Sequence, residues 1–307
     1  MFIEYHGALY ISGIVFVMPL NIWLLAIRPK TLPLAVASIV LGAASAGTIN
    51  VGVLALALLT ALLLQILSNL ANDYGDGLRG TDGHERTGPV RVLASGRVSV
   101  AQLRRAIIVV ILLALTSGLA LLALALGHDL AAWLGFLLLG ALSVLAALGY
   151  TLGRRPYGYS GLGDAAVFVF FGPVAVLGTG WLMRPELAAA GSWAALVAGL
   201  LSMAVLNINN IRDMAGDAQA GKHTLALRLG LPRARAWQAG LLALAVLAAE
   251  RLMTGWGYLA LAGLWPLAIG LKLVLTREGG ELNQALAQTA KGTLMLTAGL
   301  ALGLITS

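Results

Sequence analysis

Charged residues are scarce in this chain, and cysteine is missing altogether. Only 11% of the 307 residues are charged, whereas about a quarter of a soluble globular domain is charged. Hydrophobic residues make up 59%, and the mean hydropathy is +0.89. Without cysteine there is no disulfide framework, thiol nucleophile or thiolate metal site. The composition therefore argues against a soluble domain and indicates a polytopic membrane protein.

Other common signatures are also absent. Histidine occurs four times and is never paired at helical spacing, which argues against a zinc site. No P-loop or dinucleotide fingerprint is present, and we interpret Gly75-Asp76-Gly77 as a flexible turn. His84 and His223 are interpreted as solvated loop residues. No extended polar stretch suggests a separate soluble domain.

Apolar runs of roughly 18 to 22 residues recur along the chain, each long enough to cross a bilayer as a helix. We predict an all-α membrane protein with about nine transmembrane helices. The predicted spans are 32–48, 51–75, 102–127, 130–150, 162–183, 192–214, 235–252, 256–275 and 283–305. Residues 21–307 form a single transmembrane domain. Residues 1–20 are an N-terminal extension or the start of an interfacial helix, and Met18 is an alternative start.

Basic residues are concentrated on one side of the predicted membrane. All but three of the 20 Lys and Arg residues fall there; the exceptions are Arg184, Arg251 and Lys291. The positive-inside rule makes the basic side cytoplasmic, with the N-terminus inside and the C-terminus outside. The net charge of +7 therefore reflects topology and does not indicate nucleic-acid binding. Topology alone explains Arg104, Arg105, Arg233 and Arg235.

A polar stripe ends the second predicted span. Asn69, Asn72, Asp73 and Asp76 lie at i, i+3, i+4 and i+7, which places them on one helical face. Carboxylates at membrane depth are costly and usually functional. A basic loop follows, with Arg79, Arg86, Arg91 and Arg97.

A second stripe ends the sixth span. Asn210, Asp213 and Asp217 lie at i, i+3 and i+7, Asn207 precedes them by one turn, and Lys222 follows. Both stripes end on the cytoplasmic side, so they can face each other. Taken singly, such residues read as helix caps or interhelical hydrogen bonds. Two stripes with the same order of Asn, Asp and basic residues favour a shared site.

Four facing carboxylates would repel one another and raise each other's pKa. A hard cation removes this conflict, since Mg²⁺ binds one or two carboxylates together with water and phosphate oxygens. Nearby Arg and Lys suit the remaining phosphate charge. We therefore predict a diphosphate held by Mg²⁺ between the stripes. A lipid diphosphate fits, because its head needs this site and its tail needs the bilayer.

Several motifs resemble the UbiA superfamily of intramembrane prenyltransferases, most closely the branch that prenylates 1,4-dihydroxy-2-naphthoate in menaquinone synthesis. They are Arg28-Pro29-Lys30-Thr31-Leu32-Pro33, Asn72-Asp73-Tyr74 with Gly80-x-Asp82, Thr87-Gly88-Pro89-Val90-Arg91, Arg155-Pro156-Tyr157-Gly158-Tyr159, Asn210-x-x-Asp213-x-x-x-Asp217 and Gly221-Lys222-x-Thr224-Leu225. Many members have a third Asp four residues after the second. This chain has Gly80 there, followed by Asp82, which leaves the role of Asp82 in metal binding open.

The resemblance implies helices around a central cavity that opens laterally to lipid, in a bacterial cytoplasmic (inner) membrane. It implies Mg²⁺, in two ions, and transfer of a polyprenyl group from polyprenyl diphosphate to 1,4-dihydroxy-2-naphthoate. Diphosphate and CO₂ are lost and demethylmenaquinone forms. Basic groups and Mg²⁺ would stabilise the leaving diphosphate. A lipid-buried cavity would keep water from the allylic cation.

Residue roles follow from this expectation. Asp73 and Asp76 are predicted to hold one Mg²⁺, and Asp213 and Asp217 the other. Predicted to orient metal, water or phosphate are Asn69, Asn72 and Asn210. Predicted to bind diphosphate oxygens are Arg91, Lys222, Arg79 and Arg154. Asp73→Ala or Asp213→Ala is expected to abolish turnover in a protein that still inserts.

Four further residues have weaker assignments. Tyr150 either shields the cation with its ring or is an ordinary interface tyrosine. Arg28 either contacts the carboxylate of the aromatic acid or snorkels to the membrane surface. Asn209 and Arg212 are predicted to support the second stripe from its flank.

Two rival functions stay open. A related enzyme would prenylate 4-hydroxybenzoate, homogentisate or haem at the same diphosphate site. A cation-coupled transporter would use the carboxylates to bind Na⁺ or H⁺, but transporters place such groups near the bilayer midplane. A purely structural subunit needs no ring of polar groups. Prenyl chain length and oligomeric state do not follow from the sequence.

Overall fold

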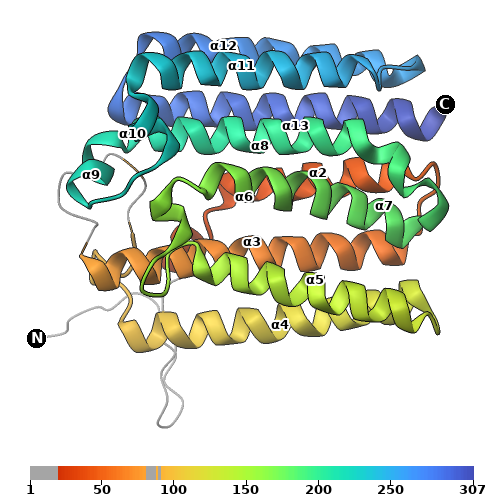
Figure 1. The fold of residues 1–307 in the computed structure, drawn as a ribbon, viewed down its shortest axis with the longest axis horizontal. Helices are drawn as coiled ribbons and strands as arrows, with labels where there is room; N and C mark the ends of the chain where they lie inside the picture. The colour runs from red at the N-terminus through yellow and green to blue at the C-terminus, as the bar shows by residue number, and fades with distance from the viewer. Residues whose placement is uncertain (1–19, 81–87, 89–90) are drawn as a thin grey trace, which may run out of the picture.

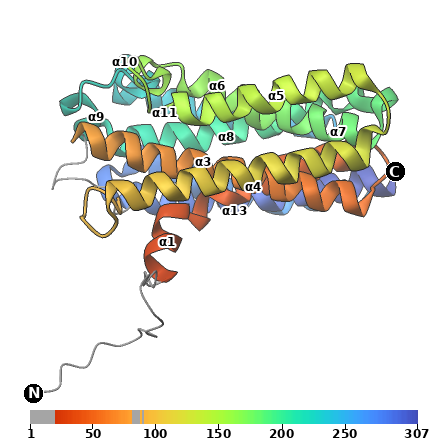
Figure 2. The same cartoon turned by 90° about the horizontal axis from the view of Figure 1, so that it is seen from below.

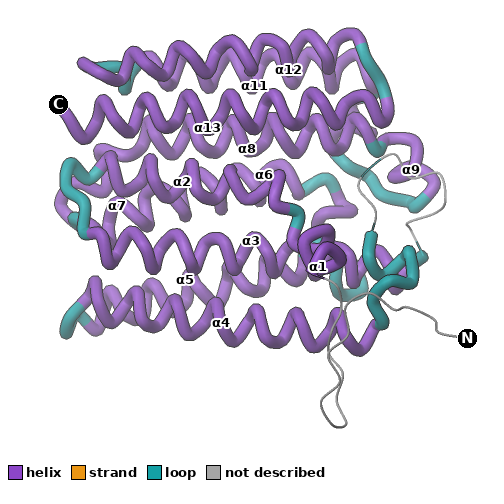
Figure 3. The backbone as a smooth tube through the Cα atoms, turned by 180° about the vertical axis from the view of Figure 1, so that it is seen from behind, coloured by secondary structure: helices purple, strands orange, loops and turns teal. Residues whose placement is uncertain are grey.

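The apolar segments form long helices, because in lipid every backbone N–H and C=O must find a partner within the protein. The computed structural model describes residues 20–80, 88 and 91–307. Within these residues the chain consists of helices and short loops, without strands (Figure 3). The long helices run side by side in an antiparallel bundle (Figure 1).

Nine helical segments build the bundle over the described part of the chain. They are α2 (Leu32–Ser45), α3 (Val51–Arg79), α4 (Val100–Leu126), α5 (Leu130–Gly149), the segment α6 (Gly163–Val169), η3 (Phe170–Leu177) and α7 (Gly178–Met183), α8 (Ser192–Arg212), α11 (Leu231–Glu250), the segment η5 (Gly255–Gly263) and α12 (Leu264–Thr276), and α13 (Leu282–Thr306). The shorter elements are α1 (Leu20–Ile27), η1 (Pro29–Thr31), η2 (Tyr157–Ser160), η4 (Pro185–Gly191), α9 (Met214–Gln219), α10 (Leu225–Leu229) and η6 (Gly279–Glu281).

The predicted all-α membrane fold is confirmed. Among the described residues, 8 stretches are long and apolar enough to cross a membrane. The remaining bundle helix, α11, begins with polar turns that contain Arg233, Arg235 and Gln238. The protein is a multi-pass membrane protein. Helix α3 continues to Arg79, past the predicted end at residue 75, so its polar stripe stays helical.

Two helix starts and one irregular turn follow directly from the sequence. The Asn50 side chain accepts a hydrogen bond from Val53 N–H at the start of α3, and Ser99 forms a capping box with Gln102 at the start of α4. Pro173 lies within η3, a π-helical turn. Proline has no N–H to donate, and a π-turn accommodates the lost bond.

Helix α1 leaves the bundle at an angle (Figure 2). The interfacial position predicted for the start of the chain stays a prediction. The buried residue Ala26 of α1 packs with Leu67 and Leu70 of α3. Arg28 follows in a left-handed conformation with φ 55°. Residues 1–19 and the predictions at Asp82, His84, Arg86, Thr87 and Pro89 lie outside the described residues.

The last helix closes the bundle. Helix α13 packs against α2, α8, α12 and η5. Glycines allow this close approach: a Cβ atom built on Gly299 or Gly303 would lie 2.2 Å from Ala260 N or 2.5 Å from Gly257 Cα. Small residues are a common basis of helix packing in membranes, where apolar burial between helices gains little.

The connecting elements η2, α9 and α10 gather at one end of the bundle, opposite the C-terminus (Figure 1). Arg91, which follows α3, and Lys222, which follows α8, lie at this end and contact Asp76 there. It is called the polar end below. The opposite end carries the turn between α4 and α5 and the C-terminus. The structure thus places the two polar stripes at one end of the molecule.

Candidate active site

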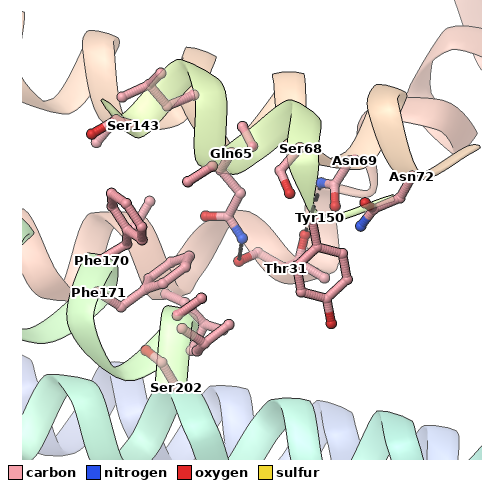
Figure 4. Close-up of a pocket in the computed structure, with 18 of the residues that line it drawn as sticks. Thr31, Gln65, Ser68, Asn69, Asn72, Ser143, Tyr150, Phe170, Phe171 and Ser202 are labelled. Carbon is pink, nitrogen blue, oxygen red and sulfur yellow. Dashed lines mark hydrogen bonds between the residues drawn. The ribbon is translucent and has the colours of Figure 1, made fainter. Parts of the chain in front are cut away.

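A cavity of about 1070 Å³ runs from the polar end into the bundle. Side chains of α2, α3, α4, α5, α8, α13 and the α6–η3–α7 segment line it. Figure 4 shows its wall, with Gln65, Ser68, Asn69 and Asn72 in a row on α3. Phe170 and Phe171 lie on the facing wall. The cavity is therefore polar near the loops and apolar deeper inside.

Asp76 is a carboxylate of the cavity wall with several polar partners. Asp76 is buried, with 1% of its surface exposed. Arg91 Nη2 donates to Asp76 Oδ2 at 2.7 Å, and the Tyr159 hydroxyl donates to Oδ1. Lys222 Nζ lies 3.6 Å from the same Oδ1. A buried carboxylate is stabilised by charge-assisted bonds of this kind.

Lys222 connects the two stripes. Its Nζ lies 3.2 Å from Asp217 Oδ1 as well as near Asp76. Burial raises the pKa of the Asp217 carboxyl, and the positive charge of Lys222 opposes that rise. The ammonium therefore separates two carboxylates that would otherwise repel each other. The prediction that the stripes face each other agrees with this contact.

Asp73 has different surroundings, although it belongs to the same predicted stripe. It is not among the residues that line the cavity. Its Oδ2 accepts from Val92 N–H at 2.9 Å and its Oδ1 from Leu93 N–H at 3.3 Å. These bonds fix the turn that follows Arg91. The assignment of Asp73 as a metal ligand stays a prediction, and its contacts describe a positioning role.

The second stripe is interrupted, because α8 ends at Arg212 and α9 begins at Met214. Asp213 lies at the break. Arg212 donates to both of its oxygens, at 2.8 and 2.7 Å, and to Asn283 Oδ1 at 2.9 Å. Asn209, Asn210, Asp213 and Asp217 nevertheless all line the cavity. Arg212 also lines the cavity, and its predicted role of supporting the stripe from its flank stays a prediction.

Asn207 lies apart from the cavity. Its Nδ2 donates to Ala234 O at 3.1 Å and to Gln238 Oε1 at 2.9 Å. It therefore joins α8 to α11. It precedes Asn210 by about one helical turn, but its side chain points towards α11.

The predicted basic residues fall into two groups. Arg28, Arg91 and Lys222 line the cavity. Arg79 and Arg154 do not. Arg79 donates to backbone carbonyls of Gly75, Thr151 and Gly153, so it ties the end of α3 to the loop after α5. Arg154 is exposed.

Tyr150 lines the cavity at the end of α5. Its ring packs between two glycines: a Cβ on Gly158 would lie 2.7 Å from Tyr150 Cε1, and one on Gly163 would lie 2.8 Å from its hydroxyl. Tyr157 meets it edge-on, with ring centroids 5.4 Å apart. The ring is thus held in place at the polar end, where either predicted role is open to it.

Tyr159 is a site residue that the sequence analysis did not single out. Besides its bond to Asp76, its ring lies beneath Lys222 Nζ, 4.9 Å from the centroid, and beside the Arg79 guanidinium at 5.3 Å. Such contacts are cation–π interactions. The sequence feature that could have identified Tyr159 was its place in the motif Arg155-Pro156-Tyr157-Gly158-Tyr159.

Gln65, which the sequence analysis missed, fastens the turn between α1 and α2 together with the predicted residue Asn69. Gln65 Nε2 donates to Thr31 O at 2.6 Å (Figure 4). Asn69 Nδ2 donates to Ile27 O at 2.8 Å. Gln65 precedes Asn69 by four residues, so the helical period could have added it to the stripe. Thr151 and Asn283 also bond to residues of the site, but no sequence pattern could have identified them.

The chain was compared with known proteins. The model of the UbiA prenyltransferase family matches residues 31–292. The 1,4-dihydroxy-2-naphthoate octaprenyltransferase of Escherichia coli (strain K12) is 45% identical over 93% of this chain and 95% of its own. The enzyme of that name from Haemophilus influenzae is 40% identical over 93% and 96%.

Solved structures share the fold. A UbiA homolog from Aeropyrum pernix K1 has a TM-score of 0.68 at 15% identity, covering 90% of this chain and 98% of its own. A UbiA homolog from Archaeoglobus fulgidus, bound to GPP and Mg²⁺, has a TM-score of 0.57 at 16% identity, covering 93% and 100%. The extent of the family match and of the sequence identity leads to one conclusion. This chain belongs to the UbiA prenyltransferase family.

Proposed function

We propose that the protein transfers a polyprenyl group from polyprenyl diphosphate to 1,4-dihydroxy-2-naphthoate. Diphosphate and CO₂ leave, and the quinol form of demethylmenaquinone remains. The observation that carries the proposal is the bridge from Asp76 through Lys222 to Asp217 at the polar mouth of an apolar cavity. The choice of 1,4-dihydroxy-2-naphthoate as the acceptor rests on the names of the bacterial relatives.

The residues present fit Mg²⁺ bound together with a diphosphate. The donors are hard oxygens from Asp76, Asp213 and Asp217, with the amides of Asn72 and Asn210 nearby on the cavity wall. Over the described residues, no three His, Cys, Asp or Glu side chains form a ready-made metal cluster. Phosphate oxygens would therefore complete the coordination. We propose two ions, one at Asp76 and one at Asp213 and Asp217.

Mg²⁺, when bound, would neutralise charge on the leaving diphosphate. The chain's own groups act beside it. Arg91 and Lys222 would turn from the carboxylates to the phosphate oxygens, since both already lie within the cavity wall. The allylic C–O bond breaks and its electron pair leaves with the diphosphate. A ring carbon of the acceptor then attacks the allylic cation. When the acceptor carboxylate leaves as CO₂, the electron pair of its C–C bond returns to the ring.

Protection of the cation falls to the apolar wall. Tyr150, Phe170 and Phe171 line the cavity beyond the carboxylates. Aromatic faces attract cations, and a cavity closed to bulk water keeps the cation from being quenched. Arg28, which also lines the mouth, is proposed to receive the acceptor carboxylate.

We further propose a bacterial cytoplasmic membrane as the location, with the polar end cytoplasmic and the C-terminus outside. The basic loops at the polar end support this orientation. A reporter fused after Ser307 tests it: alkaline phosphatase is expected to be active there and a cytoplasmic reporter inactive.

The function is tested on purified protein in detergent with Mg²⁺, octaprenyl diphosphate and either 1,4-dihydroxy-2-naphthoate or 4-hydroxybenzoate. We expect a prenylated, decarboxylated naphthoquinol by mass spectrometry, and none with EDTA. Product only from 4-hydroxybenzoate would keep the diphosphate site and overturn the acceptor. No product from either acceptor, with the protein folded, would favour the cation-coupled transporter.

A further inference from the structure

The apolar part of the cavity has a defined length. Helix α5 and the α6–η3–α7 segment touch at two levels. At the polar end a Cβ on Gly163 would lie 2.8 Å from the Tyr150 hydroxyl, and at the other end a Cβ on Gly178 would lie 3.8 Å from Phe136. The residues between Phe136 and Tyr150 span about 21 Å of helix at 1.5 Å per residue. This stretch is called the apolar arm.

Two aromatic rings stand at the far end of the arm. Phe136 meets Trp181 of α7 with ring centroids 5.2 Å apart. Both rings pack against a buried cluster that includes Leu121, Leu122 and Leu182. A prenyl tail that enters from the polar end therefore passes Gly140 before it meets these aromatic and aliphatic side chains.

Between the two contacts the walls separate at Gly140. This residue lines the cavity, and a Cβ built on it would meet no heavy atom within 4 Å. Gly140 lies ten residues from Tyr150, about 15 Å along the helix. A larger side chain at this position would project into the arm without disturbing a packed neighbour.

Helix α5 itself tolerates such a change. It packs against α3 and α4, yet none of its residues is buried. Gly140 has no positive φ, so any residue can adopt its backbone conformation. The absence of a side chain at Gly140 keeps space open in the arm, and the fold itself does not require glycine at this position.

We propose that Gly140 sets the chain length of the prenyl donor. With glycine there, the arm accepts a tail that passes this position and continues towards the contact of Phe136 with Trp181. With a bulky residue there, the free part of the arm ends about 15 Å from Tyr150 and favours shorter tails. The inference rests on the proposed function for the identity of the ligand as a prenyl diphosphate.

The test compares Gly140→Leu and Gly140→Phe with the parent. The probes are geranyl diphosphate and octaprenyl diphosphate with Mg²⁺, and the readouts are the Kd of each donor and its kcat/KM with 1,4-dihydroxy-2-naphthoate. We expect the preference for octaprenyl over geranyl diphosphate to fall at least about tenfold, the scale on which an apolar pocket senses added bulk. Gly140→Phe should act more strongly than Gly140→Leu.

Gly135 offers a matched control on the same helix. A Cβ there also meets nothing within 4 Å, but Gly135 does not line the cavity. Gly135→Phe should keep the parent preference. An unchanged preference in Gly140→Phe, or an equal loss of both donors in a folded variant, would overturn the proposal.

The binding readout separates this proposal from the proposed function. A parent that binds both donors but prenylates no acceptor would refute the enzyme assignment, while the Kd ratio would still test Gly140. A parent that binds neither donor would overturn both.

Discussion

The two polar stripes have similar sequences but different structures. In α3 the stripe stays on one unbroken helix, and Asp76 is enclosed by Arg91, Tyr159 and Lys222. In the other stripe the helix ends before Asp213, so Asn210 and Asp217 stand on different elements. The first stripe thus carries its cavity carboxylate on a continuous helix, and the second carries its carboxylates at a helix end and on the short helix that follows. The same order of Asn and Asp therefore does not guarantee the same backbone.

The largest effect is expected for Asp76→Ala. Removing this carboxylate takes one ion-pair partner from Arg91 and one from Lys222, and it removes the proposed α3 ligand for Mg²⁺. We expect kcat to fall about 10²- to 10³-fold, as for loss of a preorganised electrostatic group. The measurement is product formation by protein whose insertion and thermal unfolding have been checked. Near-normal activity of Asp76→Ala would show that catalysis does not depend on the carboxylate of α3. The structural difference between the two stripes would then have no effect on function.

Lys222→Met tests the link between the stripes. Without the ammonium, Asp76 and Asp217 lose their shared partner, and the diphosphate loses a cation. We expect kcat/KM for the donor to fall about 10- to 100-fold, the range for a hydrogen bond to a charged group. Lys222→Arg should restore part of the loss. Equal activity of Lys222→Met and parent would show that the stripes work without the bridge.

Asp73→Asn separates Asp73 from Asp76. The new amide brings an NH₂ group towards the N–H of Val92 or Leu93, so one buried acceptor bond is lost. We expect the free energy of unfolding to fall by about 1–3 kcal/mol. The Mg²⁺ concentration for half-maximal activity should stay that of the parent. Should it rise as far as in Asp76→Asn, Asp73 is a metal ligand and the two carboxylates are equivalent.

The smallest effect is expected for Arg154→Ala. This side chain is exposed and does not line the cavity. The change should alter donor binding by no more than about 0.5 kcal/mol, as for other surface substitutions. Arg91→Ala, made in parallel, should raise the KM for the donor clearly. If Arg154→Ala raised the KM for the donor as much as Arg91→Ala does, the diphosphate would lie nearer to Arg154 than the geometry suggests.

Periodicity predicted the bundle well, because long apolar runs in lipid have little alternative to the helix. It located the site less sharply. A helical face is broad, so the same stripe included Asp76, which lines the cavity, and Asp73, which holds the turn after Arg91. The spacing that grouped Asn207 with Asn210 likewise could not reveal that Asn207 bonds to α11.

Other features depend on contacts that no local pattern encodes. The end of α8 at Arg212 follows from the tertiary arrangement around Asp213, and the sequence analysis extended that helix to residue 214. Tyr159 acquires its role only when η2 meets the end of α3. The gap at Gly140 is a property of two walls, and the sequence shows only a glycine in an apolar helix.

The packing of α13 has a consequence for the assembly of the cavity. This helix contacts α2 and supplies Asn283 and Leu286 to the cavity wall. Helices that are far apart along the chain thus build one wall together. A chain in which α13 has not yet packed beside α2 can carry every carboxylate of the site and still lack a complete chamber around them.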